Sequence, residues 1–274
     1  MGLPDDLALP EDFVPRVPPE VPAEPRDAAT VVLLRDGSAG PEVFLQRRVD
    51  GMPFAGGMTV FPGGGVDQRD ADTSVSWNGP QPSWWAEQFD CTPKLARALV
   101  CAAVRETFEE SGVLLAGHSA ETVVADTSPY ADARQALVSR ELSFARFLSE
   151  AGLVLRADLL RPWSNWVTPE VETRRYDTRF FLAAMPRGQR ADAVTTEAAD
   201  AYWRTPQGAL EDWKGGHCGL LPPTWMTLTE LATCGSVANA LETDRAVGKV
   251  VPRVVRREGR WRVVLPGEPG YDET

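Results

Sequence analysis

Short apolar runs separated by turn-forming residues predict most of the strands in this chain. The run at 31–34 has four apolar residues in succession (Val-Val-Leu-Leu), and it predicts a buried strand at 29–35. A turn follows at 36–41, where glycine, serine and proline are concentrated. Similar runs predict further strands at 42–47, 58–61, 153–155, 164–168, 178–183 and 201–204, and a hairpin of 250–256 with 260–265 around Glu258-Gly259.

A helical period replaces these short runs after residue 91. Thr92 can cap a helix whose first turn suits Pro93, and Gly112 is placed to end it. Apolar residues that include Leu95 and Leu99 form one side of this helix. Four further helices are predicted at 132–151, 207–213, 224–233 and 236–246.

Two segments lack such a pattern. Residues 1–27 contain seven prolines and are expected to form an extended or disordered arm. Residues 66–91 are polar and are expected to form an inserted loop, in which Trp84 and Trp85 either pack onto the core or cover a ligand. Because no repeat or break in composition calls for a second domain, we expect one domain at 28–267 and a short tail at 268–274.

Composition and charge exclude several classes of function. The chain has 274 residues and a formal net charge of -11, so we expect no nucleic-acid partner, because an acidic surface repels a phosphate backbone. No apolar stretch approaches the roughly 20 residues that span a bilayer, and the acidic N-terminal segment does not resemble a signal peptide. The four cysteines are far apart and are expected to be reduced thiols in a cytoplasmic protein. A homodimer is left open.

Three acidic residues near the end of the predicted helix are the first candidates for chemistry. Glu106 shares a helix face with Glu109 and Glu110. Like charges at this spacing repel one another, and the helix dipole disfavours anions near a C-terminus. A bound Mg²⁺ or Mn²⁺ would remove both penalties, since hard cations prefer oxygen ligands. The helix alone leaves a solvated acidic face as the alternative.

The turn Phe61-Pro62-Gly63-Gly64-Gly65 lies upstream of this helix, and glycine lets a backbone approach a metal or phosphate closely. Together, turn and helix resemble the Nudix box, G-x5-E-x7-R-E-U-x-E-E-x-G-U, where U is a bulky apolar residue. Gly64 takes the place of the first glycine, and the segment 105–113 supplies the R-E pair, the E-E pair and the closing Gly-Val. This combination identifies the chain as resembling the Nudix hydrolases.

The sequence departs from the box in two places. Thr107 stands where the box has an apolar residue, and 41 positions separate Gly64 from Arg105 where the box has 14. About 27 extra residues therefore interrupt the motif. The first glutamate of the box has no certain counterpart, and Asp67 and Asp70 are both candidates.

An interrupted box resembles that of the coenzyme A diphosphatase group of Nudix hydrolases, the group similar to human nudix hydrolase 19. The resemblance covers roughly 28–267 and includes the segments 166–169, 174–181 and 221–224, Trp203, and Leu265-Pro266. The coenzyme A signature that precedes the box, L-L-T-x-R-S-x3-R-x3-G-x3-F-P-G-G, is partly present. Arg48 and Gly57 fit it together with the glycine turn, whereas Val49 and Pro53 replace its serine and second arginine.

The resemblance implies an α/β fold, a Nudix α/β/α sandwich around a mixed sheet, with an insertion inside the box and extra C-terminal helices. It also implies Mg²⁺- or Mn²⁺-dependent attack of water on the diphosphate of a nucleotide-containing small molecule. Coenzyme A or acyl-coenzyme A is the expected substrate, giving 3′,5′-ADP and phosphopantetheine. The ions would be held by Glu106, Glu109 and Glu110, with the carbonyl of Gly64 as an added ligand, and Arg105 would orient a glutamate.

Several roles stay open at this stage. The general base could be a box glutamate or Glu197, which precedes a late strand. Substrate phosphates could contact the backbone of Gly63 and Gly64 or the side chains of Arg48, Arg174 and Arg175, although an arginine in such a place is more often an ordinary surface residue. ADP-ribose or another nucleoside diphosphate derivative is the alternative substrate. A catalytically silent Nudix domain that binds a nucleotide as a regulator is the alternative of another class, and the intact glutamates argue against it.

Overall fold

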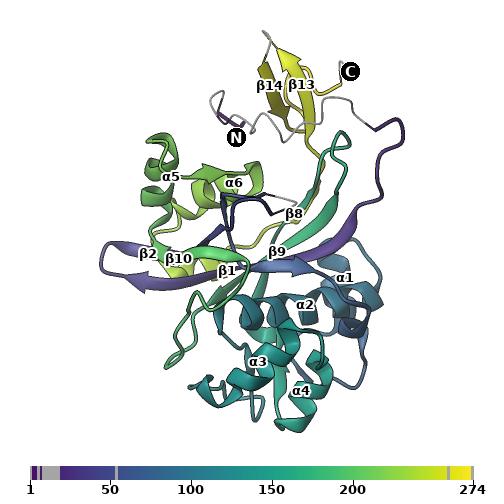
Figure 1. The fold of residues 1–274 in the computed structure, drawn as a ribbon, viewed down its shortest axis with the longest axis vertical. Coiled ribbons are helices and arrows are strands. Elements are labelled where there is room, and N and C mark those ends of the chain that lie inside the picture. Colours follow the sequence, from purple (N-terminus) through teal and green to yellow (C-terminus); the bar gives the residue numbers. More distant parts are fainter. Residues whose placement is uncertain (1, 5–6, 8–18, 53–54, 258–259, 273–274) are drawn as a thin grey trace.

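The computed structural model describes residues 2–4, 7, 19–52, 55–257 and 260–272. A nine-stranded sheet forms its middle layer (Figure 1). Its strands are β1 (Arg26–Gly37), β2 (Gly40–Arg48), β3 (Met58–Val60), β4 (Gly63–Gly65), β8 (Leu160–Val167), β9 (Tyr176–Ala184), β10 (Ala198–Arg204), β11 (Gly219–Leu220) and β12 (Lys249–Val250). The strand order is β11-β3-β2-β1-β9-β8-β12, with β10 paired to β2 and β4 paired to β1. Because β1 runs parallel to β9 and antiparallel to β2, the sheet is mixed, as expected.

Helices cover both faces of this sheet (Figure 1). One layer contains α1 (Pro82–Phe89), α2 (Pro93–Ser111), α3 (Ala131–Val138) and α4 (Phe144–Glu150). The opposite layer contains α5 (Pro206–Lys214), α6 (Pro222–Leu231) and α7 (Val237–Glu242). Smaller sheets are formed by β5 (Trp77–Asn78), β6 (Ala116–Gly117) and β7 (Val154–Arg156), and by the hairpin β13 (Arg253–Arg257) and β14 (Arg260–Val264). The α/β/α sandwich with extra C-terminal helices is confirmed.

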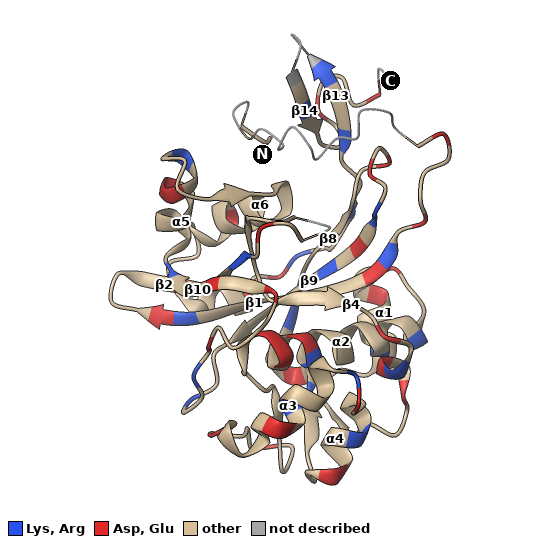
Figure 2. Cartoon of the chain, in the orientation of Figure 1, with Lys and Arg blue, Asp and Glu red and all other residues tan. Residues whose placement is uncertain are grey.

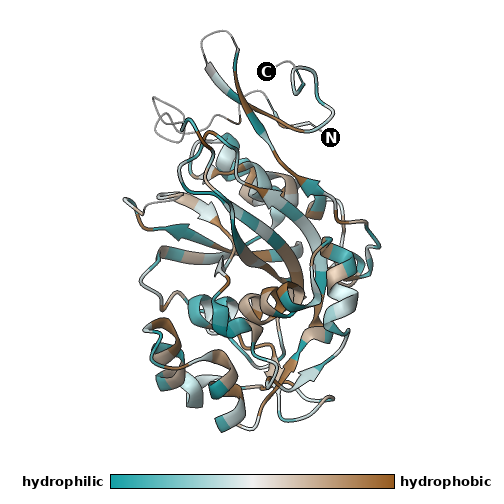
Figure 3. Cartoon of the chain, turned by 90° about the vertical axis from the view of Figure 1, so that its right-hand side faces the viewer, coloured by the Kyte–Doolittle hydropathy of each residue, from teal (hydrophilic) through white to brown (hydrophobic). Residues whose placement is uncertain are grey.

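The apolar run in β1 explains how the sheet serves two cores. Val31 and Leu33 pack into the core under α1 to α4, whereas Val32 and Leu34 pack into the core under α5 to α7. Neighbouring strand residues point to opposite faces, so four consecutive apolar residues bury both faces at once, and all four side chains are fully buried. The hydrophobic stretches accordingly run along the central strands (Figure 3).

Local signals place the ends of α2 where the sequence predicts them. The side chain of Thr92 accepts a hydrogen bond from the amide of Leu95, and Pro93 occupies the first turn. At the other end Gly112 adopts a left-handed φ of 72°, a conformation that glycine takes without strain. The polar Thr107 fits inside the apolar face because its hydroxyl donates to the carbonyl of Ala103 at 2.7 Å.

The single helix expected at 132–151 is wrong, because the structure has two helices there, α3 and α4. The chain turns at Arg140, whose φ is 62°, a left-handed conformation that interrupts a right-handed helix. Ser143 then caps α4 by accepting from the amide of Arg146. The helical spacing of apolar residues continues across the break, which is why the sequence pattern did not reveal it.

The insertion at 66–91 is more ordered than the expected loop. It contains the 3₁₀ turn η1 (Gln68–Ala71), the strand β5 and the helix α1. Trp85 and Phe89 lie one helical turn apart on α1 and are both buried in the core, whereas Trp84 keeps 38% of its surface exposed. Of the two roles considered for Trp85, packing onto the core is the one observed.

The ends of the chain are described only in part. Most of the proline-rich arm and the hairpin tip Glu258-Gly259 lie outside the described residues, and β1 begins at Arg26, three residues before the predicted strand.

Within the described part of the chain, no helix is both long and apolar enough to cross a membrane. The four cysteines are unpaired thiols, as expected.

Candidate active site

The glycine turn and the acidic end of α2 meet at close range. Strand β4 pairs with β1 so that Gly63 faces Thr30 and Gly64 faces Ala29. A Cβ atom on Gly64 would lie 2.6 Å from the carboxylate carbon of Glu106, and one on Gly63 would lie 2.5 Å from the carbonyl oxygen of Ala29. Glycine is therefore required at Gly63, where a side chain would meet the backbone of β1, whereas a side chain at Gly64 would displace the carboxylate of Glu106.

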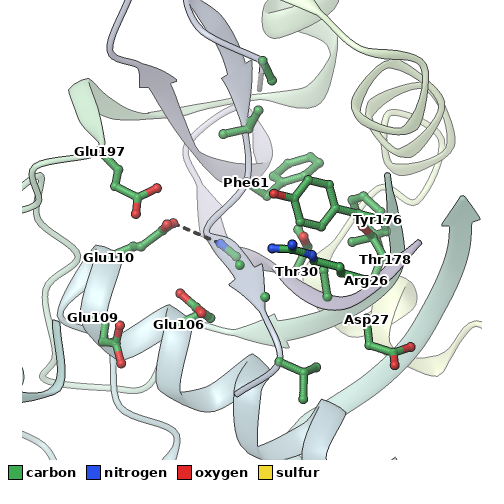
Figure 4. A pocket seen from close by; sticks show the side chains of 18 of the residues that line it. Arg26, Asp27, Thr30, Phe61, Glu106, Glu109, Glu110, Tyr176, Thr178 and Glu197 are labelled. Carbon is green, nitrogen blue, oxygen red and sulfur yellow. Dashed lines mark hydrogen bonds between the residues drawn. The ribbon is translucent and has the colours of Figure 1, made fainter. Parts of the chain in front are cut away.

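Glu110 is fixed directly by this turn. Its Oε2 accepts a hydrogen bond from the amide of Gly63 at 3.0 Å, and the residue is only 5% exposed (Figure 4). Burial raises the pKa of Glu110 well above its ordinary value, and the charges of Glu106 and Glu197 raise it further. The carboxylate of Glu197 approaches Glu110 from another loop (Figure 4) and forms an ion pair with Arg48 at 3.2 Å.

Arg105 holds the other acidic side chains in place. Its Nε and Nη2 donate to the two carboxylate oxygens of Asp70, both at 2.9 Å. Its Nη1 donates to Glu106 at 2.8 Å and to Glu109 at 3.2 Å, and Nη2 also donates to the carbonyl of Gly65 at 3.0 Å. Burial alone would lower the pKa of Arg105, but these carboxylates raise it. Arg105 thus contacts two of the box glutamates as well as Asp70.

The last two turns of α2 carry three glutamates beside a single arginine (Figure 2). Burial raises the pKa of Glu106 to about 7, with Arg105 opposing the rise and Glu109 adding to it. Burial likewise raises the pKa of Glu109. One arginine does not balance the charge of these carboxylates, and carboxylate oxygens beside a glycine turn are the donor set that suits a hard divalent cation.

The described residues do not, however, present a preassembled metal site. Within them, no three His, Cys, Asp or Glu side chains are placed to hold one ion together. The reason lies in their hydrogen bonds, because Glu106 and Glu109 face Arg105 and Glu110 faces the amide of Gly63. The three glutamates fit a divalent cation by their chemistry and charge. A bound cation would compete for their oxygens with Arg105 and the amide of Gly63.

The raised pKa of Glu106 predicts a pH-dependent stability for the metal-free protein. The carboxyl group of Glu106 binds its proton more tightly in the folded than in the unfolded protein. Its protonation therefore stabilises the folded state fully below the ordinary pKa of 4.5, and this contribution is lost as the pH rises through about 7. We therefore expect the melting temperature to fall between about pH 5 and about pH 8 more steeply for the wild type than for Glu106→Gln. Thermal unfolding in a chelator measures both slopes, and parallel curves would contradict the assignment.

The pocket beside these residues has a volume of about 830 Å³. Of the residues that the sequence suggested, it is lined by Arg48, Gly63, Gly64, Arg105, Glu106, Glu109, Glu110, Arg174 and Glu197. Arg175 is not part of this lining. It is 9% exposed, and its guanidinium donates to the carbonyls of Thr168 and Ala23, so it ties a loop to the N-terminal segment. Trp84 and Trp85 also lie outside the lining.

The structure distinguishes the two candidates for the first glutamate of the box. Asp70, one of two candidates for the first box glutamate, is the one that contacts Arg105, whereas Asp67 caps η1 and pairs with Arg69. Spacing alone favours Asp70 over Asp67, because Asp70 stands six positions after Gly64, as the glutamate does in the box. Arg26 and Tyr176 also line the pocket. Neither residue was given a role from the sequence, although Tyr176 lies in the segment 174–181 that carries part of the resemblance.

Several known proteins are similar to this chain in sequence or in fold. Acyl-coenzyme A diphosphatase NUDT19 of Xenopus laevis is 27% identical over 228 residues, which cover 69% of this chain and 59% of that protein. The protein of the same name from Gallus gallus is 29% identical over 282 residues, covering 84% and 72%. A crystal structure of a NUDIX hydrolase from Alicyclobacillus acidocaldarius superimposes with a TM-score of 0.67 at 27% identity, over 82% of this chain and 99% of that one.

The chain thus spans about three-fifths of the Xenopus laevis relative. A family model, described as the NUDT19 Nudix domain, matches residues 85–231, which is more than half of the chain and includes all of α2 with its glutamates. On this match, the protein belongs to the NUDT19 Nudix domain family of Nudix hydrolases.

Proposed function

We propose that this protein hydrolyses the diphosphate bond of coenzyme A or an acyl-coenzyme A, releasing 3′,5′-ADP and phosphopantetheine or its acyl derivative. The observation that carries the proposal is the convergence of Glu106, Glu109 and Glu110 beside Gly63 and Gly64 in a pocket of about 830 Å³. The relatives named acyl-coenzyme A diphosphatase support the substrate class.

Glu106, Glu109 and Glu110 would hold Mg²⁺ or Mn²⁺. Such an ion neutralises diphosphate oxygens and lowers the pKa of a coordinated water when it is bound. Arg105 keeps two of the three carboxylates at fixed positions through its hydrogen bonds. The amide of Gly63 keeps the third facing the pocket.

Glu197 is our candidate for the general base. Its carboxylate faces Glu110 across the pocket (Figure 4), and its side chain is 48% exposed and held by Arg48. An exposed carboxylate within the site can accept a proton from the attacking water and release it to solvent. Glu110 is the second candidate, and its buried position makes proton release to solvent slower.

A product screen tests the proposal. The full chain is incubated with coenzyme A, acyl-coenzyme A, ADP-ribose, NADH or dinucleoside polyphosphates, each with Mg²⁺ or Mn²⁺ and with excess chelator. We expect metal-dependent release of 3′,5′-ADP from the coenzyme A compounds and none in chelator. Release of AMP from ADP-ribose alone would support the alternative substrate. Binding without turnover of any compound would support a regulatory domain.

A further inference from the structure

The pocket extends to both sides of the glutamates. In one direction it passes over β4 and β1 to β9, where Arg26, Tyr176 and Arg174 line it; we call this the β9 arm. In the other direction it passes over η1 to the connection between α3 and α4, where Val138 and Leu142 line it; we call this the α3–α4 arm. The two arms lie in different layers of the fold, since α3 and α4 cover one face of the sheet (Figure 1).

The β9 arm carries positive charge beside an aromatic ring. Arg26 and Tyr176 are register partners in the parallel pair β1 and β9, and their side chains lie next to each other at the pocket (Figure 4). Among the residues that the structure describes, the guanidinium groups of Arg26 and Arg174 have no hydrogen bond or ion pair. Two arginines without a carboxylate partner suit a phosphate group, and a neighbouring aromatic face suits a nucleobase.

Three other arginines of the lining are already engaged. Arg105 and Arg48 are bound to the acidic cluster, and Arg69 is paired with Asp67 at 2.9 Å. Arg140 also lines the pocket, but it lies between Val138 and Leu142 in the connection from α3 to α4, away from Arg26 and Arg174. Among the described lining residues, the β9 arm is therefore the part of the pocket that holds two arginines whose guanidinium groups have no hydrogen bond or ion pair.

The α3–α4 arm has an apolar surface. Val138 is 40% exposed, an unusual exposure for a large aliphatic side chain in this protein, and Leu142 beside it is half-buried. Leu137 and Phe144 form a buried layer beneath them. The arm is held in shape from η1, because Arg69 donates to the carbonyl of Arg140 at 3.2 Å. An aliphatic chain placed here would cover apolar surface that now faces water.

We propose that the substrate lies across the site with its 3′-phosphorylated nucleoside in the β9 arm, at Arg26 and Arg174, and its acylated end in the α3–α4 arm, at Val138. This inference rests on the proposed coenzyme A substrate and adds the direction in which it binds. The diphosphate between the two ends then lies against the glutamates.

The first test compares coenzyme A with 3′-dephospho-coenzyme A, which lacks only the distal phosphate. We expect the wild type to prefer coenzyme A, and Arg26→Gln to reduce the ratio of the two kcat/KM values by roughly tenfold or more, since a charged hydrogen bond is lost. Arg187→Gln is the matched control, because Arg187 is exposed and outside the pocket lining. A wild type that does not distinguish the two compounds would overturn the inference.

The second test compares acyl-coenzyme A with coenzyme A. We expect Val138→Glu to reduce the acyl-to-free ratio of kcat/KM by roughly tenfold, because a carboxylate replaces apolar contact area. Val21→Glu is the control, since Val21 is 80% exposed and outside the pocket lining. If Arg26→Gln changed the acyl ratio and Val138→Glu changed the 3′-phosphate ratio, the substrate would bind in the opposite direction and the inference would be wrong.

A binding experiment separates this inference from the proposed function. Calorimetry on the full chain measures the affinity for 3′,5′-ADP and for AMP, and needs no turnover. Tighter binding of 3′,5′-ADP that is lost in Arg26→Gln supports the direction of binding even if the wild type hydrolyses no coenzyme A compound. Equal affinities for the two nucleotides, together with normal hydrolysis of coenzyme A, would overturn the direction alone.

Discussion

Replacing Glu110 by glutamine is expected to abolish diphosphate hydrolysis, lowering kcat by roughly a thousandfold or more, because a neutral amide is a poor ligand for Mg²⁺ or Mn²⁺. The fold should survive. The amide oxygen of glutamine can still accept the hydrogen bond from Gly63 that now measures 3.0 Å. Removing the charge also relieves the burial penalty and the repulsion from Glu106 and Glu197 that raise the pKa of Glu110, so the variant should melt no lower than the wild type.

Glu87→Gln is the matched control for this experiment. Glu87 lies on α1, is exposed, and is outside the pocket lining, so this variant should retain wild-type kcat. Both proteins are assayed for 3′,5′-ADP release with Mn²⁺ and for thermal unfolding. Wild-type activity in Glu110→Gln would remove the basis for metal binding by α2. Loss of activity together with a lower melting temperature would instead indicate a structural role.

The elements that the sequence predicted correctly are those set by local signals. The limits of α2 follow from Thr92, Pro93 and Gly112, which act within one turn of the helix. The break between α3 and α4 was missed because arginine and serine also occur inside helices. Only the structure shows that Arg140 has a left-handed φ and that Ser143 caps α4. Residues with mixed local preferences take their conformation from tertiary contacts, which a periodic pattern does not record.

The candidate site divides in the same way. The box residues on α2 were found because helical spacing alone brings them together. Glu197 and Arg48 were each suggested, but their ion pair, across 149 positions in sequence, depends on the pairing of β10 with β2. Arg26 enters the pocket because β1 pairs with β9. Strand pairing is non-local, so the sequence named residues here without placing them beside one another.

Asp70 illustrates how an insertion can preserve a motif. The box is interrupted, but the extra residues follow Asp70, so its spacing from Gly64 is kept while α1 and β5 fold between it and Arg105. Its carboxylate accepts three hydrogen bonds, from Nε and Nη2 of Arg105 and from the amide of Asp67. Asp70 is only 3% exposed. We infer that this buried pair connects the insertion to the catalytic helix.

Asp70→Asn should therefore be destabilising, by about 2 to 3 kcal/mol, since the buried Arg105 loses charged hydrogen bonds to Asp70 and keeps only those to Glu106 and Glu109. The amide nitrogen of asparagine would also face the N–H groups of Arg105, which cannot accept a hydrogen bond. Urea unfolding followed by circular dichroism measures the loss. Because Arg105 orients Glu106 and Glu109, kcat should fall as well, under conditions where the variant remains folded.

Two further variants separate charge from position. Asp67→Asn removes a carboxylate whose partner, Arg69, is exposed, so its effect should stay below about 1 kcal/mol. Asp70→Glu restores the residue type of the box and should recover part of the stability and of kcat. Equal effects of Asp67→Asn and Asp70→Asn would show that the negative charge of η1, and not the contact with Arg105, supports the site. A much larger loss of stability and kcat in Asp70→Asn than in Asp67→Asn would support Asp70 as the counterpart of the first box glutamate. Asp70 has the spacing from Gly64 that the box requires, and the insertion follows it.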